Sequence, residues 1–122
     1  MNTATFIIIT GPCASFEKVN AIENRTLYNC PEAYKWDKHV AEYTRHIIDG
    51  NEPCAIITHS EIVIDQFLIS LKNNRLDVKD VEMYFINEYN EVEKLDVKQH
   101  GRIRKAPRGF FEQHHDDLVA LL

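Results

Sequence analysis

The feature that most constrains the fold is an apolar run at residues 54–57 that ends abruptly in Thr58-His59-Ser60. A stretch whose apolar residues recur at helical spacing follows at once, over residues 61–74. A buried strand that stops on polar residues and leads into a helix is typical of a parallel sheet, and it places those residues at the sheet's carboxyl edge. We therefore expect His59 to lie where such sheets carry their chemistry.

Further strands and helices are predicted on both sides of this run. The expected elements are a strand at 6–9, a strand at 26–29, a helix that begins after Pro31 and ends at Gly50, a hairpin of strands 81–86 and 92–97, a basic irregular segment at 102–108, and a terminal helix anchored by Phe110 and Phe111. This order indicates an α/β fold: a mainly parallel sheet with flanking helices and a C-terminal β-hairpin. The length of 122 residues suits one domain, so we expect residues 1–122 to fold as a unit.

Charge and cysteine content narrow the class of protein. The formal net charge of -5 disfavours general binding to nucleic acid, which needs a basic face. Cys13, Cys30 and Cys54 are odd in number and lack C-x-x-C spacing, which fits a reducing cytoplasm and gives no support to a disulfide framework or a metal site. The apolar run near the start of the chain is too short to span a membrane. We expect a cytoplasmic protein that binds neither metal nor membrane.

The turn after the first strand sits where a phosphate-binding loop would sit. Such a loop has the form G-x-x-x-x-G-K-[ST], because glycines let backbone N–H groups close around phosphate and the lysine reaches the β and γ oxygens. Here Gly11 takes the first position, Phe16 replaces the second glycine, Lys18 comes one place late, and Val19 follows it. A bulky Phe16 obstructs the approach of the backbone to phosphate, so we expect an ordinary strand-to-helix turn.

Three stretches, in this order, resemble the ABC-type, OLD-like AAA ATPases, which are P-loop NTPases. Cys30-Pro31-Glu32-Ala33 resembles the start of their N-P-E-A-H-L-H-P segment, and Thr58-His59-Ser60 resembles their switch-histidine segment. The tail, from Gly101-Arg102-Ile103 to Asp117-Leu118, resembles the G-x-I-x-x-W-P-x-G-F-F-D-Q…D-L ending of a subgroup of predicted bacterial ATPases. The resemblance covers residues 26–122 and implies a partial P-loop NTPase-like sheet.

The resemblance also implies which positions correspond to the ATPase machinery. In these ATPases two acidic or amide residues end the strand before the helix, where they hold Mg²⁺ and activate the attacking water, and the switch histidine contacts the γ-phosphate. Asn29 and Cys30 match the strand-end pair, and His59 matches the switch histidine. Asn29 carries no charge for a cation that prefers carboxylate oxygen, and Cys30 is a poor general base for water. We therefore assign no catalytic residue with these three.

The chain also has no room for the middle of such an ATPase. Too few residues separate Gly11 from the second strand to hold the region with the signature motif, which closes ATP at a dimer interface. Residues 1–25 read as a vestigial phosphate-loop-like strand and turn, and residues 26–122 as the C-terminal part of an ATPase domain. We expect a non-catalytic protein without a cofactor, which binds a larger related ATPase as a decoy, inhibitor or accessory subunit. A phage or mobile element would suit such a protein.

Two alternative functions stay open. In the first, the chain is a minimal ATP-binding protein or ATPase that uses Mg²⁺, with Gly11, Lys18, His59 and Ser60 as its nucleotide-binding candidates. In the second, the basic segment contacts nucleic acid. The same segment is our candidate for binding a protein partner, and its cations are Arg102, Arg104, Lys105 and Arg108. Association with a second copy of the chain also stays open.

Overall fold

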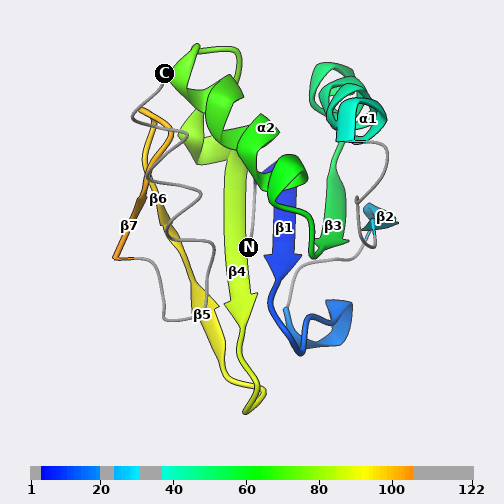
Figure 1. The fold of residues 1–122 in the computed structure, drawn as a ribbon, viewed down its shortest axis with the longest axis vertical. Coiled ribbons are helices and arrows are strands. Elements are labelled where there is room, and N and C mark those ends of the chain that lie inside the picture. Colours follow the sequence, from blue (N-terminus) through cyan, green and yellow to red (C-terminus); the bar gives the residue numbers. More distant parts are fainter. Residues whose placement is uncertain (1–3, 20–23, 31–36, 106–122) are drawn as a thin grey trace.

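The computed structural model describes residues 4–19, 24–30 and 37–105, which form a sheet with two helices on one face (Figure 1). The strands of this sheet are β1 (Phe6–Thr10), β2 (Thr26–Cys30), β3 (Cys54–Thr58), β4 (Val81–Ile86) and β5 (Val92–Lys94). Their order is β2-β3-β1-β4-β5, and every neighbouring pair is parallel except β4 with β5. The predicted α/β fold, with a mainly parallel sheet and a C-terminal hairpin, is confirmed.

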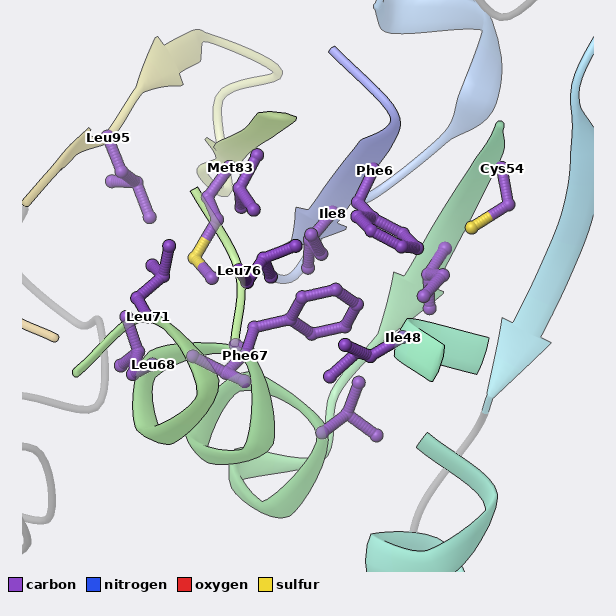
Figure 2. Close-up of a cluster of buried hydrophobic side chains, with 14 of the residues drawn as sticks. Phe6, Ile8, Ile48, Cys54, Phe67, Leu68, Leu71, Leu76, Met83 and Leu95 are labelled. Atoms are coloured by element: carbon purple, nitrogen blue, oxygen red, sulfur yellow. The ribbon is translucent and has the colours of Figure 1, made fainter. Parts of the chain in front are cut away.

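Both helices, α1 (Asp37–Gly50) and α2 (Glu61–Lys72), pack on the same face of the sheet and enclose the larger apolar core (Figures 1 and 2). Phe6 and Ile8 project from β1 into this layer, and Phe67 projects from α2 to meet them. The rings of Phe6 and Phe67 meet edge-on, with centroids 5.4 Å apart. Burial of a side chain of this size contributes about 1.5–3 kcal/mol, so the contact between α2 and β1 is a principal source of stability.

The other face of the sheet carries a smaller apolar cluster, built from the residues that alternate with those of the first. Ile7 and Ile9 of β1 lie there with Ala55 and Ile57 of β3. Val19, which follows the turn after β1, is buried against them. Because β1 is the middle strand and is buried on both faces, its sequence is a continuous apolar run and does not alternate.

The region beyond β4 differs in part from the prediction. β4 and β5 form the expected hairpin, but the expected strand at 92–97 is divided, and its second half, β6 (Asp96–Val97), pairs with β7 (Ile103–Arg104). The segment expected to be irregular therefore begins as a strand. The turn between β6 and β7 packs on α2 at Gly101, which has a φ of +87° and where a Cβ would lie 2.7 Å from the Leu68 carbonyl oxygen. Short 3-10 helices, η1 (Phe16–Lys18) and η2 (Val78–Asp80), were not expected.

The observed ends of α1 and α2 can be compared with those predicted from the sequence. α2 begins directly after Ser60, as expected. At the end of α1 the left-handed residue is Asn51, with a φ of +52°, whereas Gly50 still belongs to the helix. The predicted start of the first helix, at residues 31–36, and the terminal helix lie outside the described residues. Neither described helix is long and apolar enough to cross a membrane.

Candidate functional site

The sheet brings several predicted positions to one edge because their strands are parallel. β3 lies between β2 and β1, and the three strands run in the same direction, so their carboxyl ends are neighbours (Figure 1). In the register of β2 and β3, Cys30 lies opposite Thr58, with Asn29 just before it. His59 follows the end of β3, and Gly11 follows the end of β1. This edge is the candidate site.

The phosphate-loop-like turn at this edge uses its backbone N–H groups within the protein. The N–H of Cys13 donates to the carbonyl oxygen of Ile86, at the end of β4, with an N···O distance of 3.4 Å. Further bonds run from the N–H groups of Ala14, Glu17, Lys18 and Val19 to oxygens of Gly11, Ser15 and Phe16, at 3.2–3.3 Å. A phosphate cradle needs N–H groups that converge on the ligand. Here they close the turn on itself and on β4.

Gly11 is explained by its contact with β4. Its φ is +108°, a conformation that favours glycine, and a Cβ there would lie 2.2 Å from the carbonyl oxygen of Ile86. The backbone of β4 thus fills the space that a side chain would need. Gly11 is therefore required for the packing of the turn, whether or not a phosphate ever binds there.

Lys18 does not stand at the start of a helix that could assist it. It is exposed and ends η1, a single 3-10 turn, after which Val19 is buried. Within residues 4–19 and 24–30 the structure contains no α-helix, so the described chain offers no helix N-terminus behind this turn to attract an anion. The expected strand-to-helix turn is thus a strand-to-3-10 turn.

His59 and Ser60 occupy the short link between β3 and α2. The hydroxyl of Thr58, which is fully buried, accepts a hydrogen bond from the N–H of Ser60 at 2.9 Å. This bond fixes the link and leaves His59 exposed. Ser60 stands at the N-cap position of α2, but its hydroxyl makes no capping bond. Its Oγ is buried and has no hydrogen-bond partner in the part of the chain that the structure describes. A polar atom in that state is ready to bond a group placed at the N-terminus of α2.

The positions that match the metal and water residues of an ATPase are only partly described. Asn29 is exposed at the end of β2, and the backbone of Cys30 pairs with β3. The Cys30 side chain and Glu32 lie outside the described part. Among the described side chains, no group of three or more His, Cys, Asp or Glu residues is arranged to hold a metal ion.

The basic segment lies elsewhere in the molecule. Arg102, Arg104 and Lys105 are exposed on and beside β7, whereas Arg108 is outside the described residues. The turn before β7 packs on α2 beside Leu68, about two helical turns from His59. Within the described residues, Arg102, Arg104 and Lys105 are therefore not brought into one site with His59.

A cleft of about 600 Å³ lies near the C-terminal ends of α1 and α2, away from His59. It is mostly polar, and it contains three carboxylates and one guanidinium. Its lining residues are Ile48, Asp49, Asn51, Asn74, Arg75, Leu76, Asp77, Asp80 and Gln99. No sequence pattern predicts this cleft, because its residues come from the ends of separate elements.

Two clusters of hydrogen-bonded polar side chains were not predicted from the sequence. On β4, the Tyr84 hydroxyl donates to the Glu82 carboxylate, and Lys94 Nζ of β5 lies 3.8 Å from the same carboxylate. Burial, and then the bond to Glu82 and its charge, raise the pKa of Tyr84. The strand period places Glu82 and Tyr84 on one face and so could have revealed the first contact. The second cluster, around Gln99, joins residues far apart in the sequence and left no local signal.

Comparison with known proteins gives one partial match. Residues 76–121 match a family described as a protein of unknown function, DUF3696. The match begins before η2 and runs through β4, the hairpin and the basic segment. No curated protein and no solved structure matches the chain.

Proposed function

We propose that this chain is a non-catalytic relative of the C-terminal part of an ABC-type, OLD-like AAA ATPase domain, and that it acts by binding another protein. The match over residues 76–121 supports the proposal, because that family is associated with the C-terminal regions of AAA-like ATPases. The arrangement of strands supports it too, since Asn29, Cys30 and His59 share an edge with the end of β1.

The closed turn after β1 is the observation that most supports a non-catalytic role. Cys13 donates its N–H to β4, and Gly11 faces the backbone of Ile86 at a distance that excludes even a methyl group. ATP with Mg²⁺ does not fit a turn of this kind, because phosphoryl transfer depends on a phosphate cradle and on charges that stabilise the transition state. A protein with this fold is better suited to binding than to turnover.

Titration calorimetry tests this conclusion directly. We expect no binding heat when millimolar ATP is titrated into the protein, with or without Mg²⁺. Lys18→Ala and His59→Ala are the matched variants, because each removes one exposed candidate for phosphate contact. Binding that depends on Mg²⁺ and disappears in both variants would show that the chain is a nucleotide-binding protein.

The proposed partner is a larger related ATPase, on which this chain acts as a decoy, inhibitor or accessory subunit. The exposed cations Arg102, Arg104 and Lys105 form the candidate contact surface, which suits an acidic patch on the partner. Tagged protein recovered from its native cell should carry such an ATPase, and the purified pair should show an altered rate of ATP hydrolysis. Arg104→Glu should weaken the complex, and Lys79→Glu, at another exposed site, should not. An unchanged complex with Arg104→Glu would exclude this surface.

One observation favours a second candidate function. The buried Ser60 Oγ without a partner stands beside exposed His59 at the N-terminus of α2, where the helix dipole attracts anions. In this alternative the site binds a phosphate group of ATP without the loop after β1. Ser60→Ala would then abolish nucleotide heat while Lys18→Ala leaves it unchanged, a pattern that separates this alternative from a working phosphate loop.

A further inference from the structure

β2 is the terminal strand of the described sheet, and one side of its backbone has no strand partner among the described residues. The N–H of Thr26 donates to the Pro53 carbonyl oxygen, so the backbone of Thr26 faces β3. Successive residues of a strand face opposite sides, and therefore the N–H and C=O groups of Leu27 and Asn29 face away from β3. Among the described residues no strand pairs with β2 on that side, and both side chains are exposed, Leu27 at 49%.

The sequence of β2 itself has none of the usual protection against pairing. Its sequence, Thr-Leu-Tyr-Asn-Cys, contains no charge and no proline, and Thr26 and Tyr28 are of types that favour strands. The opposite edge of the sheet differs: β5 is Val-Glu-Lys and exposes Glu93 and Lys94, charges that discourage pairing. The contrast marks β2 as the edge that accepts another strand.

Apolar side chains lie beside the backbone edge of β2 on both faces of the sheet. Tyr28 of β2 and Tyr43 of α1 meet edge-on, with ring centroids 6.2 Å apart, and Tyr43 is 49% exposed. Leu27 adds exposed apolar surface on the other side of the sheet. An incoming strand would therefore bury apolar side chains on both faces while it bonds to the backbone between them.

We infer that β2 pairs antiparallel with β2 of a second copy of this chain, about a two-fold axis at Tyr28. The register follows from the backbone: Leu27 of each copy lies opposite Asn29 of the other, and each such pair exchanges two N–H···O=C bonds. Tyr28 then lies opposite its own symmetry mate, in a position without backbone bonds, where side chains approach most closely. The two copies of Tyr28 and Tyr43 form one aromatic cluster. The strand is complementary to itself, which is the requirement for a two-fold interface.

Sedimentation velocity over a wide range of protein concentration tests the inference. The wild-type protein should shift from monomer to dimer as the concentration rises. Leu27→Lys places a charge on the edge of β2 and should remain monomeric with an unchanged circular dichroism spectrum. Val92→Lys is the matched control, since Val92 is 42% exposed on the other edge strand, and this variant should dimerise as the wild type does. A wild-type protein that stays monomeric, or a Leu27→Lys variant that still dimerises, would overturn the inference.

Cross-linking tests the register separately. In a Cys13→Ser, Cys30→Ser background, Tyr28→Cys should form a disulfide-linked dimer under mild oxidation, because the Cα atoms of an antiparallel pair without backbone bonds lie about 4.5 Å apart, within the range that a disulfide spans. Glu93→Cys, on β5, should stay monomeric under the same conditions. Cross-linking at residue 93, or its absence at residue 28 at concentrations where the dimer forms, would contradict pairing through β2. Pairing with a strand of a different protein would likewise leave residue 28 without a homodimer cross-link.

Discussion

At the scale of single residues, Gly11 shows how a position that resembles a ligand-binding motif can have a structural cause. Gly11→Ala would force a Cβ to within 2.2 Å of the Ile86 carbonyl oxygen in a backbone conformation that alanine rarely adopts. We expect the free energy of unfolding to fall by about 2–4 kcal/mol, as measured by urea denaturation.

Gly50→Ala provides the comparison, because a Cβ at Gly50 meets nothing within 4 Å. It lies at the end of α1, where alanine is a better helix former, so this variant should be unchanged or up to about 1 kcal/mol more stable. Equal stability of the two variants would mean that the turn after β1 does not pack on β4 as described.

Tyr84 gives the protein a specific response to alkaline pH. Burial, helped by the bond to Glu82, raises its pKa in the folded protein above the usual value of about 10. A group with a raised pKa contributes stability that is complete below the unfolded pKa and is lost as pH rises toward the folded pKa. The free energy of unfolding should therefore decline from about pH 10 upward, and Tyr84→Phe should make this decline shallower.

Tyr89→Phe is the control for this measurement. Tyr89 is 74% exposed in the turn between β4 and β5, so its removal should leave the pH dependence of unfolding as it is in the wild type. If Tyr84→Phe and Tyr89→Phe gave the same alkaline profile as the wild-type protein, the buried hydrogen bond to Glu82 would not contribute to stability.

The sequence was sufficient to place His59 at the carboxyl edge of the sheet, but it did not predict which side chains there form hydrogen bonds. An apolar run that ends in a polar triplet before a helix has one common outcome, an exposed residue at the edge of a parallel sheet. The bond from the Ser60 N–H to the Thr58 hydroxyl, and the Ser60 hydroxyl without a partner among the described residues, follow from three-dimensional packing. Local pattern predicts position better than it predicts hydrogen bonding.

At the scale of elements, Gln99 holds the β6–β7 ribbon against the end of α2. Its Nε2 donates to the carbonyl oxygens of Leu71 and Leu76, at 2.6 and 2.8 Å, and its Oε1 accepts from the N–H of Val78 at 2.8 Å. Gln99→Leu removes the bonds to the Val78 N–H and the Leu76 carbonyl oxygen, whereas the Leu71 carbonyl oxygen still accepts from the N–H of Asn74 at 3.1 Å. We expect a loss of about 2–4 kcal/mol in the free energy of unfolding and faster amide exchange in β6 and β7.

His100→Ala, at the next position, separates this effect from any change in the turn itself. His100 is exposed, so its replacement should change the free energy of unfolding by less than about 0.5 kcal/mol. Amide exchange in β6 and β7 that is equally slow in Gln99→Leu and the wild type would show that the ribbon is held by other contacts.

Elements with strong periodicity were predictable, and those held by distant partners were not. β1, β3 and α2 follow from continuous apolar runs and helical spacing, which depend on nearby residues alone. β7 has two residues and is defined by its pairing with β6 and by Gln99, whose partner Leu71 is 28 positions away. A strand of two residues is too short to show an alternating pattern. It could not be predicted from the sequence because it depends on contacts with distant residues.

At the scale of the whole molecule, β1 joins the two apolar clusters of the described sheet. It is the middle strand, parallel to β3 on one side and β4 on the other, so the residues that resemble a vestigial loop strand lie at the centre of the sheet. Ile8 belongs to the cluster under the helices and Ile7 to the cluster on the opposite face. Residues 1–25 and 26–122 are therefore not expected to fold independently of each other.

This topology predicts an effect across the sheet. Ile7→Ala removes a fully buried side chain from the face without α2, and should lower the free energy of unfolding by about 2–5 kcal/mol. Because both clusters share β1, the lost stability should also appear as faster hydrogen exchange of the core amides of α2, on the opposite face. The free energy of exchange of these amides should fall by the same amount as the free energy of global unfolding. Val92→Ala, on the outer strand, should leave that exchange unchanged. Faster exchange confined to β1 and its own face would show that the two clusters open separately and that the N-terminal strand is an addition to the C-terminal fold.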